Sequence, residues 1–222
     1  IGIGGDGFVY VIYRSGNNVM LHKYSPCSAG LTAQAGFPVT VTGVSDVTCP
    51  VAGLDRCNDG NILSSHTVAV DDVNPQRVYV SYATNTTAGV NENVFVRVSS
   101  DGGATFSAPA QVNSPGNARR YMPWVCSVGG AAYVTWYDRR FGIPAFSNDF
   151  TDFYGGSVRL DAGGALVAGP EFRISGVSDS NCGSGWPCAP RATGDSETCP
   201  VQPQLAGVCR LADGTGGGQR CD

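Results

Sequence analysis

Hydrophobic and polar residues alternate with a period of two in short segments along most of the chain. Such alternation, in runs of about four to eight residues rich in β-branched and aromatic side chains, is typical of half-buried β-strands. Glycine, proline, asparagine and aspartate bound these runs, and the i, i+3, i+4 spacing of an amphipathic helix is hard to find. The pattern predicts an all-β chain.

One of these runs occurs three times, each time with a tyrosine followed by a valine at its centre. The copies are 8–14 (FVYVIYR), 77–83 (RVYVSYA) and 131–137 (AAYVTWY), and they bring Tyr10, Tyr79 and Tyr133 into register. The spacing of the copies is that of a four-stranded propeller blade with loops of variable length. The repeat therefore predicts consecutive blades with the tyrosine in the second strand of each.

Further strands are predicted before and after each copy. First strands are expected at 65–70, 122–128 and 202–208, third strands at 19–25, 94–100 and 153–160, and fourth strands at 38–42, 110–113 and 172–175. This order predicts one propeller domain over 1–222. It contains about three blades, at 1–43, 64–114 and 120–176, and the start of another at 201–222.

The segment 99–106 carries a more specific motif. It reads SSDGGATF and matches S-x-D-x-G-x-T-[W/F], with Ser99, Asp101, Gly103, Thr105 and Phe106 at the fixed positions. This segment resembles the Asp box of the sialidase-like BNR-repeat propellers, and it lies where that family has it, between the third and fourth strands of a blade. A degenerate copy, LDAGGAL at 160–166, occupies the same place in the next blade.

The resemblance implies a sialidase-like β-propeller of six blades, of which this chain would supply about half. We therefore expect either an internal fragment or one chain of a larger assembly, because a propeller must close to cover its blade edges. The motif itself is expected to be structural. Its aspartate accepts backbone N–H groups within the turn, its glycine supplies a positive φ, and its aromatic residue fills the gap between sheets.

The lengths of the predicted loops indicate which face of the disc binds ligands. Turns between strands 1 and 2 and between strands 3 and 4 lie on one face and are short and rich in glycine and aspartate. The loops between strands 2 and 3 and the connections between blades lie on the other face and are long and varied. We call this second face the loop face and expect function there, because loops tolerate insertions and carry binding residues.

A cluster of arginines, with Tyr137 and Asp138, is predicted on the loop face of the third blade. Resemblance to the sialidases implies that Tyr137 and Asp138 are catalytic, as nucleophile and acid/base, and that arginines grip a substrate carboxylate bidentately. The candidate substrate-binding arginines are Arg119, Arg120, Arg139 and Arg140. The alternative is that these residues form ion pairs and caps that order a long loop. The F/Y-R-I-P motif of sialidases is absent, since Gly142 stands where its arginine belongs.

Other aromatic and acidic residues have two interpretations each. Trp186, in a cysteine-rich loop, either stacks on a sugar ring or anchors its own loop. Asp149 and Asp152 offer closely spaced oxygen ligands for a structural calcium ion, and hydrogen bonding within the loop is the alternative. No cofactor is expected to be required. Trp124 and Trp136 fall within strands and are expected to pack in the core or between blades.

Nine cysteines in turn-rich segments predict a disulfide framework and a secreted, extracellular protein. Cys49 with Cys57 and Cys182 with Cys188 are the candidate pairs, although sequence alone does not determine connectivity. A zinc site is the rival interpretation, but the C-x-x-C spacing typical of such sites is missing. The count is odd, so at least one cysteine is free, bonded to another chain, or without its partner in this sequence.

Charge and composition narrow the set of partners. The chain has 222 residues with a net charge of −4, and Lys23 is its only lysine. It has no basic tract for nucleic acid and no apolar run approaching the ~20 residues of a membrane span. Two functions remain: a secreted exo-glycosidase of the sialidase type acting on terminal acidic sugars, or a non-catalytic extracellular propeller. The second would bind a glycan or glycoconjugate, or other protein chains that complete the propeller or an assembly.

Overall fold

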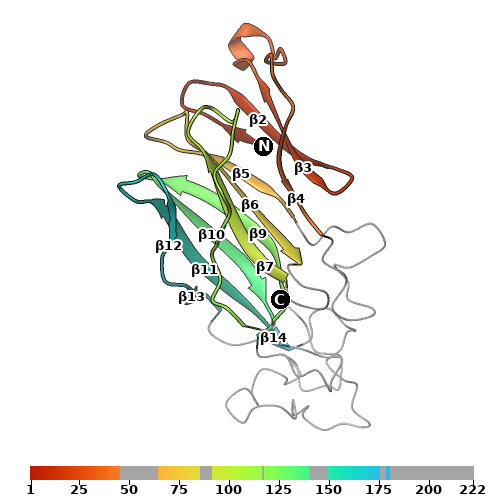
Figure 1. Cartoon of the computed structure of the whole chain (residues 1–222), viewed down its shortest axis with the longest axis vertical. Coiled ribbons are helices and arrows are strands. Elements are labelled where there is room, and N and C mark those ends of the chain that lie inside the picture. The colour runs from red at the N-terminus through yellow and green to blue at the C-terminus, as the bar shows by residue number, and fades with distance from the viewer. Residues whose placement is uncertain (46–64, 86–91, 117, 141–149, 176–178, 181–222) are drawn as a thin grey trace, which may run out of the picture.

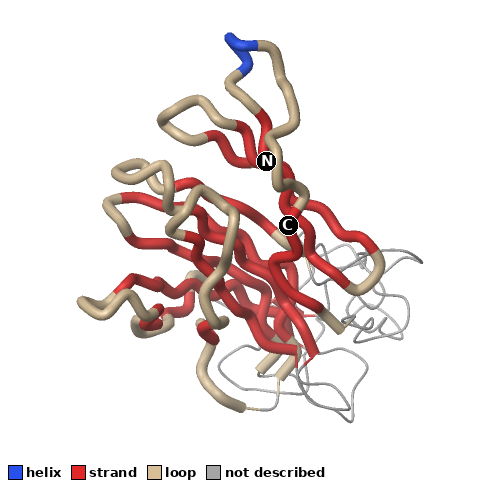
Figure 2. The backbone as a smooth tube through the Cα atoms, turned by 45° about the horizontal axis from the view of Figure 1, so that its top comes forward, coloured by secondary structure: helices blue, strands red, loops and turns tan. Residues whose placement is uncertain are grey.

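The computed structural model describes residues 1–45, 65–85, 92–116, 118–140, 150–175 and 179–180. Within these residues the protein is almost entirely β-structure, with a single short 3-10 helix, η1 (Cys27–Ala29), at the far end of the first sheet (Figure 2). No helix among them is long and apolar enough to cross a membrane.

The strands form three antiparallel sheets that follow one another in chain order (Figure 1). Blade 1 contains β1 (Gly2–Ile3), β2 (Val9–Ser15), β3 (Asn18–Tyr24) and β4 (Val39–Gly43). Blade 2 contains β5 (Thr67–Val70), β6 (Val78–Asn85), β7 (Glu92–Ser99) and β8 (Ala110–Gln111). Blade 3 contains β9 (Arg120–Val128), β10 (Ala131–Asp138), β11 (Phe150–Leu160), β12 (Leu166–Ala168), β13 (Phe172–Arg173) and β14 (Asp179–Ser180).

In each sheet the strands lie side by side in sequence order, as in the blades of a propeller. This confirms the predicted all-β fold built from consecutive four-stranded antiparallel blades. At the outer edge of blade 3, several short strands take the place of the single fourth strand predicted at 172–175. Along the long strand β11, β12 pairs at the C-terminal end, β13 near the middle and β14 at the N-terminal end, so the fourth strand of this blade is discontinuous.

The hydrophobic core lies between the blades, and blade 2 is buried on both faces. Residues alternate sides along a strand, so Val78, Val80 and Tyr82 of β6 pack with blade 1 while Tyr79 packs with blade 3. Trp136 of β10 is fully buried in this second interface. The period-two pattern of the sequence thus becomes a stack of sheets, in which blade 2 covers blade 1 and blade 3 covers blade 2.

The turn at 99–106 is held by its own side chains. The Asp101 carboxylate accepts hydrogen bonds from the Thr105 backbone N–H at 2.9 Å, the Thr105 hydroxyl at 2.6 Å and the Ser99 hydroxyl at 2.7 Å. Gly103 has a φ of 91°. Phe106 packs against the apolar cluster between blades 1 and 2. The turn therefore closes blade 2 and also fills the interface with blade 1.

The cysteines of the two predicted disulfides lie outside the residues that the structure describes. Cys27 and Cys126 are free and exposed. Cys49, Cys57, Cys182 and Cys188 lie outside the described residues, so both candidate pairings stay predictions.

Gly156 shows how closely blades 2 and 3 approach. A Cβ atom there would lie 2.9 Å from Cγ1 of Val112 and 3.4 Å from the Trp136 ring. We expect Gly156→Ala to lower the free energy of unfolding by about 1 to 3 kcal/mol through overpacking. Gly5→Ala is the matched control, because its Cβ would meet nothing within 4 Å. Urea denaturation of both variants tests the interface, and equal stabilities would contradict it.

Candidate functional site

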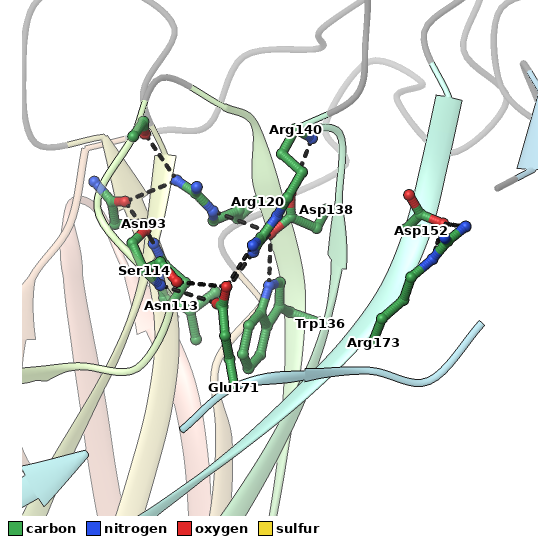
Figure 3. A network of polar contacts seen from close by, with 12 residues as sticks. Asn93, Asn113, Ser114, Arg120, Trp136, Asp138, Arg140, Asp152, Glu171 and Arg173 are labelled. Atoms are coloured by element: carbon green, nitrogen blue, oxygen red, sulfur yellow. Dashed lines mark hydrogen bonds and ion pairs between the residues drawn. The ribbon is translucent and has the colours of Figure 1, made fainter. Parts of the chain in front are cut away.

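Charged and amide side chains gather at the loop-face ends of blades 2 and 3 (Figure 3). The strands end together there: Arg120, which begins β9, and Asp152, near the start of β11, both pair with Asp138, which ends β10. This end is opposite the turn that contains Asp101. The polar cluster, as we call it, consists of Glu92, Asn93, Asn113, Ser114, Arg119, Arg120, Asp138, Arg140 and Glu171.

Asp138 is the centre of the polar cluster and is fully buried. Its Oδ2 accepts hydrogen bonds from Nε of Arg120 at 3.1 Å, Nε1 of Trp136 at 3.1 Å and the Arg140 guanidinium at 2.5 Å. Its Oδ1 accepts the Arg140 backbone N–H at 2.9 Å. A buried carboxylate is stable only when paired and hydrogen-bonded, and two guanidinium groups meet that need here.

Arg140 links Asp138 to Glu171, which precedes β13. Its guanidinium pairs with both carboxylate oxygens of Glu171 and stacks over the Tyr154 ring, 4.0 Å from its centroid. Burial works against the charge of Arg140, but hydrogen bonds to Asp138 and Glu171 outweigh it, so the pKa of Arg140 is raised. The residue is therefore held in place by two carboxylates and an aromatic face.

Glu171 also connects blade 3 to blade 2. The Ser114 backbone N–H donates to its Oε2 at 2.9 Å, and the Ser114 hydroxyl donates to its Oε1 at 2.5 Å. Burial raises the pKa of this carboxyl, but the hydrogen bonds from Arg140 and Ser114 prevail and lower it from the usual 4.5 to about 2. Glu171 is thus ionised at any ordinary pH.

Asn93 and Asn113 join Arg120 to the end of blade 2. Arg120 donates to Oδ1 of Asn93 and to the Gly116 carbonyl, both at 3.1 Å. Nδ2 of Asn113 donates to the same Asn93 oxygen at 2.9 Å, and Oδ1 of Asn113 accepts the Val94 backbone N–H at 2.7 Å. Arg120 therefore spans the interface between the two blades instead of pointing to solvent.

The pKa of Glu92 is shifted in the opposite direction from that of Glu171. It is fully buried, and one carboxylate oxygen accepts Nε of Arg119 at 2.5 Å. The other oxygen, Oε1, has no hydrogen-bond partner among the residues that the structure describes. Burial raises the pKa of Glu92, and the Arg119 charge and hydrogen bond offset only part of this effect. One end of the two blades thus holds two carboxyls whose pKa values are displaced in opposite directions.

Tyr137 and Asp138, the predicted catalytic pair, lie on opposite faces of blade 3. Successive residues of a strand point to opposite sides, so Asp138 is buried toward blade 2 while Tyr137 is 41% exposed on the outer face. There Tyr137 stacks on Tyr121 at 5.7 Å and contacts Phe153 at 5.3 Å between ring centroids. The structure brings Asp138 together with arginines, and Tyr137 together with aromatic rings.

The other predicted residues are placed as follows. Three of the candidate arginines are buried: Arg119, Arg120 and Arg139. Both Arg120 and Arg140 form ion pairs with Asp138, as in the alternative interpretation of these residues. Trp186 and Asp149 lie outside the described residues. Asp152 accepts hydrogen bonds at 2.9 Å from Arg173 and Ser175. In the described part of the chain no group of three or more histidine, cysteine, aspartate or glutamate residues could hold a metal ion, and the calcium site stays a prediction.

Sequence reasoning missed Glu92, Asn93, Asn113 and Glu171. Glu171 is 31 residues from Arg140 and 57 from Ser114, so no local motif joins them. Glu92 and Asn93 carried a weak signal, because they end a long loop at the start of a predicted strand. A rule that collects polar residues at strand ends on the loop face would have found that pair.

The comparisons with known proteins give only a distant structural likeness. No family model and no curated protein matches the sequence. The GH93 α-L-arabinofuranosidase of Fusarium graminearum, solved with arabinobiose, is 13% identical with a TM-score of 0.45, over 78% of this chain and 47% of that one. A protein from Lactobacillus plantarum is 12% identical with a TM-score of 0.32, over 78% and 55%. The chain spans about half the length of these proteins, and neither likeness indicates an activity.

Glu171 and Glu92 predict opposite pH dependences of stability. Because the pKa of Glu171 is lowered to about 2 on folding, its ionised form stabilises the fold above its usual pKa of 4.5 and the effect is lost as the pH falls toward 2. Glu171→Gln should therefore be less stable than the wild type at neutral pH, with a difference that shrinks in acid. Urea unfolding across this pH range measures it.

Glu92→Gln is the matched comparison. The raised pKa of Glu92 means that its contribution is complete below its usual pKa and is lost as the pH rises through the folded-state value. Relative to the wild type, this variant should gain stability as the pH rises. If the free energy of unfolding changes with pH in the same way in the wild type and both variants, the opposite pKa shifts of these two carboxyls are wrong.

Proposed function

We propose that this chain is part of an extracellular β-propeller that binds glycans at its loop face. The observation that carries the proposal is a pair of neighbouring rungs at the loop-face end of blade 3. In one rung Arg120 pairs with Asp138, and in the next Tyr121 pairs with Tyr137. The two rungs face opposite sides of the blade: Tyr137 presents an exposed aromatic ring on which a sugar ring can stack, and the buried ion pair of Arg120 and Asp138 holds the strand ends that position it.

The position of the polar cluster supports this proposal. Buried ion pairs are a poor source of stability, because their desolvation penalty can exceed their attraction. The opposite end of the blades closes with short turns held by Asp101 and Asp161, and there the buried Asp71 pairs with Arg77. The fold therefore does not require so many buried charges, and groups with displaced pKa values concentrate at functional sites.

The extracellular part of the proposal rests on the cysteines. Nine cysteines in turn-rich segments are typical of proteins from an oxidising compartment. The described blades also leave faces that further blades would cover, so other protein chains are among the proposed partners.

Hydrolysis of terminal acidic sugars, as by an exo-glycosidase of the sialidase type, is the second candidate. The observation that favours it is Glu92, a buried carboxyl with a raised pKa and an oxygen that has no partner within the described part of the chain. Glycosidases use a carboxylic acid of this kind to protonate the leaving oxygen. Against it, Arg120 and Arg140 already pair with Asp138 and Glu171, so a substrate carboxylate would have to compete for them.

Tyr137→Ser tests glycan binding. Loss of the exposed ring should weaken binding by roughly tenfold or more, the effect of removing an aromatic contact worth about 1.4 kcal/mol. Binding is measured on a panel of immobilised glycans with acidic and neutral terminal sugars. Val128→Ser, on the same blade at the opposite end, is the control and should bind as the wild type does. Equal loss in both variants, or no binding by the wild type, would refute the proposal.

Glu92→Gln tests hydrolysis. If Glu92 is the proton donor, the variant should lose about 10² to 10⁴ of the rate on fluorogenic sialosides while it still binds the glycan panel. A wild type that binds glycans without turnover would eliminate the enzyme and leave the binding function intact. Turnover that survives in Glu92→Gln would eliminate Glu92 as the donor.

A further inference from the structure

The three repeat tyrosines differ in one respect. Tyr10 and Tyr79 are 0% exposed, whereas Tyr133 is 43% exposed. Tyr10 packs in the cluster between blades 1 and 2, and Tyr79 packs between blades 2 and 3 and donates its hydroxyl to the Gly130 carbonyl at 2.9 Å. Each is covered by the blade that follows it, and the described residues contain no blade after blade 3.

The first strand of the following blade provides much of this cover. In the first interface β5 contacts β1 and β2, and in the second β9 contacts β5, β6 and β7. Each of these strands has one buried valine that packs against the preceding blade, Val68 in β5 and Val125 in β9. The first strand of the following blade thus covers part of the face, and the second strand of that blade, β6 or β10, covers more of it.

The outer face of blade 3 exposes several large apolar side chains, and contiguous exposed apolar patches mark interaction surfaces. Trp124 is 69% exposed there, and Val128 and Tyr133 lie exposed on the same two strands. Trp136, on the inner face of the same blade, is 0% exposed. The expectation that both tryptophans pack in the core or between blades thus holds for Trp136, and the described residues place nothing over Trp124.

We propose that residues 202–208 form the first strand of a fourth blade and cover Trp124 and Tyr133 on the outer face of blade 3. This segment reads QPQLAGV and aligns with MPWVCSV at 122–128. The alignment puts Leu205 at the position of Val125, which packs on the preceding blade. Gln204 takes the position of Trp124, on the other side of the proposed strand; the whole segment lies outside the described residues. The proposal does not rest on the proposed glycan binding, but both use the outer face of blade 3: Tyr137 lies at the loop-face end of that face, and Trp124 and Tyr133 lie further along it.

Hydroxyl-radical footprinting of the full chain, read by mass spectrometry, tests this packing. Trp136 is an internal reference, because it is the same residue type buried in the same blade. If the segment covers the face, Trp124 should react as slowly as Trp136 in the wild type. Leu205→Asp should make Trp124 reactive and leave Trp136 protected, while Gln204→Asp, with the same charge on the other side of the strand, should leave both protected.

Three results would overturn the proposal. Trp124 could react much faster than Trp136 in the wild type, which would leave the face open. Its protection could persist in Leu205→Asp, which would mean that another segment covers the face. Protection could also depend on protein concentration, which would identify a second copy of the chain as the cover. If Leu205→Asp exposes Trp136 as well, and so has unfolded, Leu205→Ala replaces it and should expose Trp124 partially.

Discussion

The burial of a sheet face against the next sheet is the interaction on which this structure depends. Each blade is a small antiparallel sheet with apolar residues on both sides, and neither side is stable in water alone. Blade 2 is buried on both faces, with Val80 covered by blade 1 and Tyr79 covered by blade 3. Stability is therefore shared between neighbours, and the first strand of each blade belongs as much to the preceding blade as to its own.

The polar cluster follows from the same stacking. Where blades 2 and 3 meet at the loop face, Glu171 reaches across to Ser114, and Arg120 reaches across to Asn93. Apolar packing is non-directional, whereas these hydrogen bonds have defined geometry. They hold the two blades in one orientation, so any site built on these strand ends depends on how the blades pack.

The candidate site was only partly predictable, for reasons visible in single residues. The sequence placed Arg120 and Asp138 at strand ends on the loop face, which the register confirms. The resemblance to the sialidases also paired Tyr137 with Asp138, but adjacent strand residues point to opposite faces. Glu92 and Glu171 were missed because their partners are distant in sequence. Their opposite pKa displacements arise from burial and neighbours that exist only after folding.

The sequence by itself determined the all-β fold, the repeat of blades and the turn chemistry, because period-two alternation, the aligned tyrosines and the hydrogen bonds of Asp101 are local. Only the tertiary structure decided which face of each strand is covered and which charges become pairs. Both depend on the sheet that packs opposite. Because that sheet is distant in sequence, the local pattern of residues does not reveal which face it covers or which charges it supplies. Arg140 shows this most clearly: the sequence allows either a substrate-binding group or a member of an ion pair, and in the fold its guanidinium pairs with two carboxylates.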